Sequence, residues 1–178
     1  VLVDLTVCDF MLPKSTDFVT HVDFIQSPET VALYYKVPLW SDKHFALMAE
    51  TFKQLGRAGN KTAYIPMIAQ SHFGNEQTMV RFVPDANGGY KGDFSIMERY
   101  LDTVEKNMGK PQIVVLYVWD HFAGGKYFGN GGNKAKQVLI PVTQLDPATG
   151  KTQTVELPRF EEAAARAAWK PIIVELTE

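Results

Sequence analysis

The sequence has too few cysteines for a disulfide framework or a cysteine-based zinc site, because Cys8 is its only one. Cys8 falls in a segment of alternating apolar residues, so we expect a buried structural thiol there. No apolar run reaches the roughly 18 residues of a membrane-spanning helix. No signal peptide is recognisable, and the chain begins with valine, which suggests an amino end that has been trimmed.

The chain also lacks a charge imbalance, since 18 basic and 20 acidic residues give a net charge of -2. Nucleic-acid-binding proteins usually present a strongly basic surface, so we expect no nucleic-acid partner. Apolar residues, by contrast, make up 46% of the 178 positions and aromatic residues 12%, which is typical of a folded globular protein. The aromatic residues suit both carbohydrate stacking and ordinary core packing.

Strand and helix patterns alternate along most of the chain. Strands are predicted at residues 2–11, 20–26, 61–69, 78–83 and 112–119, with a hairpin formed by residues 137–145 and 151–157. Helices are predicted at residues 41–55, 95–108 and from 161 onward, and residues 30–40 are expected to be irregular. The repeated strand-helix order after residue 20 predicts a parallel α/β sheet. Three such units are too few for a closed barrel, which leaves a small open sheet or a barrel cut short.

The stretch at residues 114–122 is the most informative in the chain. A continuous apolar run from Val114 to Trp119 predicts a strand that is buried on both faces, and the run stops at Asp120 and His121. Folds with parallel sheets place their active sites at the carboxyl ends of strands. Asp120 is therefore a candidate to hold a substrate hydroxyl, orient a base or act as acid/base. The alternatives are an aspartate that binds the amides of the next loop and a histidine that is only a loop residue.

A second polar segment, residues 70–76, follows the predicted strand at 61–69 and should reach the same sheet edge as Asp120. Its His72, Asn75 and Glu76 suit multiple hydroxyl contacts, although a plain polar surface loop fits equally well. A metal site would need further ligands that the sequence does not reveal, so we predict no metal.

Tryptophans and glycines give two further indications. Trp40 is a candidate sugar platform, or else a packed tryptophan beside a helix that Ser41 caps. Trp119 is a second candidate platform. The glycine-rich loop at residues 120–136 lacks the spacing of Walker and Rossmann motifs, so we predict no nucleotide and no other cofactor.

Several blocks together resemble glycoside hydrolase family 123 and its uncharacterised bacterial relatives, which are large secreted or periplasmic proteins. The blocks are VPLWSDKHFALM at 37–48, LGRAGNKTAYIPMI at 55–68, HFGNEQTMVRF at 72–82, DFSIMERYLD at 93–102 and VVLYVWD at 114–120. The resemblance implies a partial (β/α)₈ TIM barrel, about its first three βα units, at residues 16–178. Residues 1–15 would contribute a β-strand from the end of a preceding β-sandwich domain. It also implies secretion or a periplasmic location for the full-length parent.

The resemblance further implies hydrolysis of glycosidic bonds as part of a larger enzyme. Characterised members remove N-acetylgalactosamine with retention: the substrate's acetamido oxygen is the nucleophile, an Asp orients it and a neighbouring Glu is the acid/base. No Asp-Glu dipeptide occurs in this chain, and Asp120-His121 and Asn75-Glu76 are its nearest approximations. We therefore expect the acid/base to be missing from this chain.

The implied sugar site is formed by Asp120 and His121 as catalytic candidates. Trp40, His72, Asn75, Glu76 and Trp119 would contact the substrate, a glycan or glycoside. Two other functions stay open: a non-catalytic glycan-binding module, and a small α/β domain with a structural or interaction role. A barrel cut short leaves strand edges exposed, so we expect self-association through them.

Overall fold

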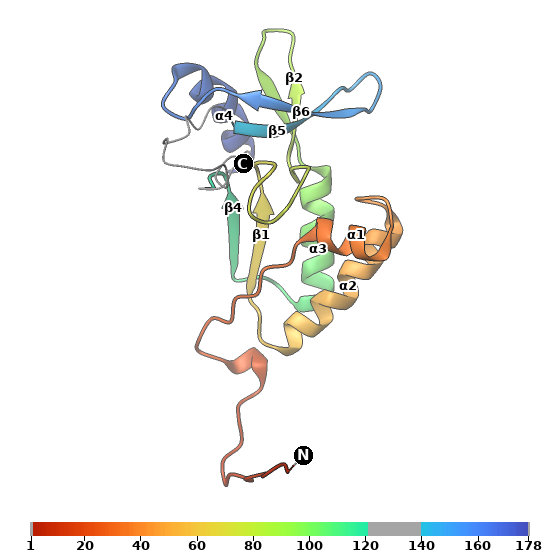
Figure 1. Ribbon diagram of the computed structural model, residues 1–178. Coiled ribbons are helices and arrows are strands. Elements are labelled where there is room, and N and C mark those ends of the chain that lie inside the picture. The colour runs from red at the N-terminus through yellow and green to blue at the C-terminus, as the bar shows by residue number, and fades with distance from the viewer. Residues whose placement is uncertain (1, 121–139, 178) are drawn as a thin grey trace, which may run out of the picture.

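The computed structural model describes residues 2–120 and 140–177, which form a mixed α/β fold. After a 3₁₀-helix at Ser15–Asp17, its described elements are two β-sheets and four α-helices (Figure 1). In chain order they are α1 (Pro28–Tyr35), α2 (Asp42–Arg57), β1 (Thr62–Pro66), β2 (Arg81–Pro84), β3 (Tyr90–Asp93), α3 (Ser95–Met108), β4 (Ile113–Tyr117), β5 (Ile140–Leu145), β6 (Thr152–Leu157) and α4 (Ala163–Glu175). None of these helices is long and apolar enough to cross a membrane.

The first sheet is a parallel pair, β1 and β4, in which Thr62 lies opposite Ile113 and Pro66 opposite Tyr117. An isolated parallel bridge from Val22 to Asn60 places the segment before α1 on the other side of β1. Parallel pairing therefore brings three segments of the chain together, and their carboxyl ends face the same way. The predicted strand at residues 20–26 is reduced to that single bridge.

Helices α2 and α3 pack side by side and cover one face of β1 (Figure 1). Each helix begins where the sequence predicts, and Ser41 caps α2 by accepting a hydrogen bond from the His44 N–H. Apolar residues at helical spacing then enter one core: Phe45, Met48 and Phe52 from α2, and Met97, Tyr100 and Val104 from α3. Ala63 and Ile65 of β1 complete this packing.

The second sheet has the order β3-β2-β5-β6 and lies beyond the carboxyl ends of β1 and β4 (Figure 1). Its hairpins, β2–β3 and β5–β6, are joined by a parallel contact between Phe82 and Gln144. Helix α4 packs on this sheet, with Trp169 edge-on to Phe82 at a ring distance of 5.2 Å. The sequence predicted the β5–β6 hairpin but not a separate sheet, because pairing of β2 with β5 joins residues far apart in the chain.

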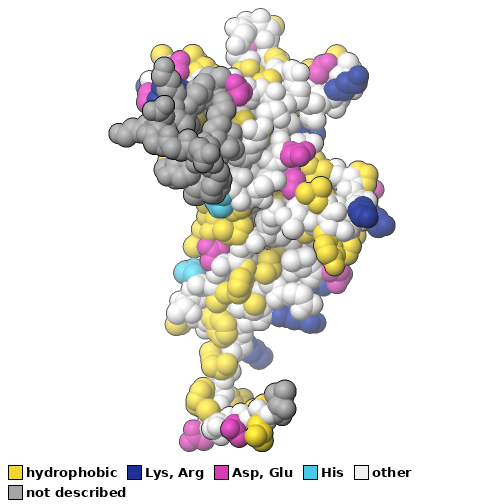
Figure 2. Space-filling model, in the orientation of Figure 1, with side chains coloured by type: hydrophobic (Ala, Val, Ile, Leu, Met, Phe, Trp, Pro, Cys, Tyr) yellow, Lys and Arg dark blue, Asp and Glu magenta, His cyan; other side chains and the backbone are white. Residues whose placement is uncertain are grey.

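The amino-terminal prediction is wrong in two respects. Residues 2–11 form no strand, and Cys8 is exposed rather than buried. No described strand lies beside this segment, so its alternating apolar side chains have nothing to pack on, and Figure 2 shows them exposed along the extended end of the chain. They are Leu2, Val3, Leu5, Val7, Phe10, Met11 and Leu12.

Two further predictions need correction. Residues 28–35 form helix α1 rather than an irregular connection, because Ser27 caps the helix and Pro28 fits its first turn. The apolar run at 114–119 is not buried on both faces, since Ile113, Val114 and Leu116 are 38–44% exposed. Helices α2 and α3 cover β1, whereas the edge strand β4 is less covered by them.

Candidate functional site

Asp120 and His72 meet where the two parallel strands end. Asp120 follows β4 and His72 lies in the loop that follows β1, as the sequence predicted for a shared sheet edge. The carboxylate oxygen Oδ2 of Asp120 accepts the backbone N–H of His72 at 2.5 Å and its ring Nδ1–H at 2.9 Å. Asp120 is 1% exposed, whereas the His72 side chain is 42% exposed. The buried carboxylate thus holds a histidine whose ring reaches solvent.

The aromatic rings of Phe73 and Tyr117 pack against the His72 ring. The Phe73 ring lies 4.3 Å from the His72 ring, and Tyr117 packs edge-on to Phe73 at 4.7 Å. The Tyr117 hydroxyl oxygen lies 3.0 Å from His72 Nδ1. Burial, with a further contribution from the negative charge of Asp120, raises the pKa of Tyr117 above its ordinary value, so this hydroxyl stays protonated.

The same face continues along β1 to a second polar pair. Tyr64 and Tyr117 lie on one face of the parallel pair, because Tyr64 is opposite Val115 and Tyr117 is two residues farther along. The Tyr64 hydroxyl donates to Asp23 at 2.5 Å, and this bond raises the pKa of Tyr64 to about 12. The face therefore presents the two tyrosines together with the exposed Asp23 carboxylate, a mixture that suits sugars.

Asn75 organises the loop that carries His72. Its side-chain amide donates to the carbonyls of Ile68 and Gln77 at 2.8 and 3.0 Å. Its carbonyl oxygen accepts from the backbone and hydroxyl of Ser71 at 3.3 and 2.5 Å. Asn75 is 1% exposed, so its polar atoms serve the loop and not solvent. The neighbouring Glu76 side chain is exposed.

Trp40 is packed beside the start of α2. Its backbone N–H donates to His44 Nδ1 at 3.1 Å, and its indole N–H donates to the Gln77 side chain at 3.2 Å. The ring lies against Phe45 at 6.1 Å. This is the packed arrangement that the sequence left open, and it links Trp40 to the His72 loop through Gln77.

Of two buried ionisable residues near this loop, Glu29 was missed from sequence, and His44 lies in the candidate segment that begins at Trp40. Glu29 is 6% exposed and binds backbone N–H groups of the loop, and His44 is fully buried between Trp40 and Pro28. Burial raises the pKa of Glu29 and lowers the pKa of His44. Ser27-Pro28-Glu29 reads as a helix start, and recognising it would have placed Glu29 in a first turn.

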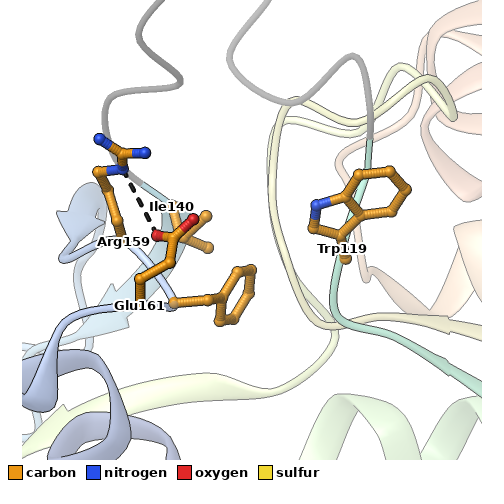
Figure 3. A pocket seen from close by; sticks show the side chains of 5 residues that line it. Trp119, Ile140, Arg159 and Glu161 are labelled. Carbon is orange, nitrogen blue, oxygen red and sulfur yellow. Dashed lines mark ion pairs between the residues drawn. The ribbon is translucent and has the colours of Figure 1, made fainter.

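Trp119, the residue before Asp120, lines a pocket (Figure 3). The pocket has a volume of about 270 Å³ and is lined by Trp119, Ile140, Arg159, Phe160 and Glu161. Figure 3 shows the Trp119 ring on one side and the ion pair of Arg159 and Glu161, 3.5 Å apart, on the other. Trp119 is 55% and Phe160 40% exposed. An indole face opposite charged hydrogen-bonding groups suits a pyranose ring.

The predicted site is thus partly assembled. The structure brings His72 to Asp120 and puts Trp119 next to the latter, while Asn75 and Trp40 lie in the packing behind the loop. His121 lies outside the described residues. Within residues 2–120 and 140–177, no group of three or more His, Cys, Asp or Glu side chains is arranged to bind a metal ion.

Comparison with known proteins identifies the family of the chain. Residues 26–178 match the family "Glycoside hydrolase 123, catalytic domain". Among solved structures, a family 123 glycoside hydrolase from Clostridium perfringens, studied for glycolipid glycan hydrolysis, superposes with a TM-score of 0.67 at 15% identity. The match covers 93% of this chain and 27% of that one. No curated protein matches the chain significantly. Since the family match spans most of its length, the chain belongs to the glycoside hydrolase 123 catalytic-domain family.

Proposed function

We propose that this chain takes part in the hydrolysis of glycosidic bonds, with a sugar bound over His72, Asp120 and Trp119. The observation that carries the proposal is the His72–Asp120 pair at the carboxyl ends of two neighbouring parallel strands. That edge is where parallel α/β folds bind their ligands. Membership of a glycoside hydrolase family makes a glycan the expected ligand.

The proposed framework is the first part of a (β/α)₈ barrel. Three observations support it: the parallel pairing of β1 with β4, the parallel bridge from Val22 to Asn60, and the helices α2 and α3 that cover one face of β1. In such a barrel the face that carries Tyr64 and Tyr117 would turn inward. The match covers 27% of the Clostridium perfringens chain. We therefore propose the activity for a larger enzyme of which this chain forms part.

The proposed substrate is an N-acetylhexosaminide cleaved with retention. The acetamido oxygen attacks the anomeric carbon as the bond to the leaving oxygen breaks, and water later opens the cyclic intermediate. His72 would bind the sugar, and Asp120 would hold the imidazole ring of His72 in place. We assign the acid that protonates the leaving oxygen to neither residue, because Asp120 is buried and already accepts two hydrogen bonds from His72.

Trp119 is the proposed platform for a sugar ring. Stacking of C–H groups on the indole would hold the ring in the pocket, and Arg159 and Glu161 would bind its hydroxyls. Phe160 lines the same pocket and adds apolar surface. The pocket volume of about 270 Å³ is at the small end for ligand sites, which favours a single sugar unit there.

The test is hydrolysis by the full-length protein of aryl N-acetylgalactosaminide and of the matching aryl galactoside. We expect release of the aryl group only from the N-acetylated sugar, because the galactoside lacks the nucleophile. NMR of the first-formed sugar should show the retained anomer. Cleavage of both glycosides at equal rates would refute substrate assistance. Binding without cleavage would instead support the glycan-binding module.

A further inference from the structure

Glu29 lies in the first turn of α1, between the loop that carries His72 and the start of α2. Ser27 caps this helix by accepting the Thr30 N–H, and the Ser27 hydroxyl donates to the carbonyl of Phe73 at 2.9 Å. The start of α1 is therefore fixed to the loop at the residue directly after His72. The segment before it pairs with Asn60 through the parallel bridge at Val22, so its position is set by the sheet.

A single carboxylate oxygen of Glu29 fixes the other end of the loop. Oε1 accepts the backbone N–H of Glu76 at 3.0 Å and that of Gln77 at 3.1 Å. Glu29 is 6% exposed, so water does not compete well for these bonds. Two N–H groups that converge on one buried oxygen would both lose their acceptor if the side chain were removed.

Hydrogen bonds within the loop connect the Glu29 anchor to the residues on both sides of His72. Asn75 ties the loop to Ile68 at its start and to Gln77 at its end. Ser71 and Asn75 are joined by two further bonds, and the Gln70 N–H donates to the Asn75 carbonyl at 2.6 Å. A shift at Glu76 and Gln77 would therefore move Asn75, and with it the chain on both sides of His72.

We propose that Glu29 is a positioning residue of the candidate site, which acts through the loop at residues 70–77 to hold His72 over Asp120. Glu29 contacts the backbone N–H groups of Glu76 and Gln77, and through them the loop. This inference rests on the proposed function for its effect on hydrolysis, but not for its effect on the loop. The alternative is a residue that stabilises α1 without influence on His72.

The test compares Glu29→Ala and Glu29→Gln with Glu50→Ala. Glu50 is an exposed carboxylate on α2 whose partner is Lys53, so its removal controls for a lost charge on a helix. The measurements on the chain are hydrogen exchange of the Glu76 and Gln77 amides and the NMR titration of the His72 ring. The measurements on the full-length protein are kcat and KM for an aryl N-acetylgalactosaminide.

In Glu29→Ala we expect faster exchange at both amides, a shifted His72 titration, and a kcat lowered about 10- to 100-fold with a smaller change in KM. Glu29→Gln keeps an oxygen acceptor of the same length and should recover most of each effect. Glu50→Ala should behave as wild type in all measurements. These outcomes separate positioning from general stabilisation, because a purely structural role would leave the His72 titration unchanged.

An unchanged His72 titration in Glu29→Ala, with the protein still folded, would overturn the proposal. If that variant fails to fold, Glu29→Gln decides. A folded Gln variant with the amide exchange of wild type and a lower kcat would show that Glu29 does not act on His72 through the loop. If the wild type cleaves no glycoside, the proposed function fails while the NMR measurements still decide the role of Glu29.

Discussion

The carboxylate of Asp120 holds His72 at two points, by its backbone N–H at 2.5 Å and by its ring Nδ1–H at 2.9 Å. The residues are 48 positions apart and meet because β1 and β4 pair in parallel. Since a carboxylate can only accept, the contact places a ring proton on Nδ1. A histidine fixed in orientation in this way is suited to bind a substrate hydroxyl or amide.

Replacing Asp120 with Ala should weaken both the fold and the activity. The backbone N–H of His72 would lose a buried acceptor, at a cost of about 1–3 kcal/mol in the free energy of unfolding. We expect kcat/KM for an aryl N-acetylgalactosaminide to fall about 10- to 100-fold, because the His72 ring would no longer be oriented. Urea denaturation and steady-state kinetics measure the two effects.

Asp120→Asn and Asp102→Ala are the matched variants. Asn keeps an oxygen acceptor, so we expect a smaller loss of stability but a comparable loss of activity. Asp102 is exposed on α3, and its replacement should change neither quantity. Wild-type kinetics in a folded Asp120→Ala protein would remove Asp120 from the site.

Replacing Trp119 with Ala should affect substrate binding more than stability. Trp119 is 55% exposed, so we expect the free energy of unfolding to change by no more than about 0.5 kcal/mol. Loss of ring stacking should raise KM up to about tenfold, equivalent to about 1.4 kcal/mol. Trp119→Phe keeps an aromatic face and should recover most of the affinity. A KM equal to wild type in both variants would show that no sugar stacks there.

The sequence was sufficient for elements that depend on local pattern. Helix α2 begins after its Ser41 cap, and its apolar residues recur at helical spacing, so its range and buried face were predicted. The meeting of His72 with Asp120 was also predictable in outline, because both follow parallel strands. In each case one physical rule, capping or the shared edge of parallel strands, decides the outcome.

Other features depend on what surrounds a segment, which sequence pattern does not record. Residues 2–11 alternate like a strand, yet they form none because no described strand lies beside them. The run at 114–119 looks buried on both faces, but the helices cover β1 and leave Val114 at an open edge. Asn75 looked like a sugar ligand, and only its four hydrogen bonds reveal that it holds the loop.

Stability should fall in acid partly because of His44. Trp40 donates to Nδ1 and the Nε2–H donates to the Pro28 carbonyl, so the ring is held neutral, and burial lowers its pKa from 6.5. A group whose pKa is lower in the folded state stabilises the fold above its unfolded value, and this contribution is lost as the pH falls below 6.5. His44→Gln cannot titrate, so it should lack that loss.

Urea denaturation from neutral to mildly acidic pH checks this prediction. The stability of wild type relative to His44→Gln should decrease as the pH falls, whereas His21→Gln, which removes an exposed histidine, should lie within about 0.5 kcal/mol of wild type at neutral pH. The pH dependence from Glu29 runs in the opposite direction. Because its pKa is raised in the folded state, its contribution to the free energy of unfolding falls as the pH rises. If the free energy of unfolding changes with pH in the same way in wild type and His44→Gln, His44 does not contribute to the loss of stability in acid.

The open edge of β4 should make the isolated chain self-associate. β4 pairs with β1 on one side and with no other strand among the described residues, and Ile113, Val114 and Leu116 on it are 38–44% exposed. An unpaired apolar strand edge readily pairs with another chain, and a lysine on such an edge opposes this. Val114→Lys should therefore reduce self-association in sedimentation velocity at high protein concentration.

Val174→Lys is the control, because Val174 is also 44% exposed but lies on α4, and it should associate like wild type. Equal association in both variants would place the contact elsewhere, and a monomeric wild type would count against the truncated barrel, since the proposed barrel needs a further strand on this edge.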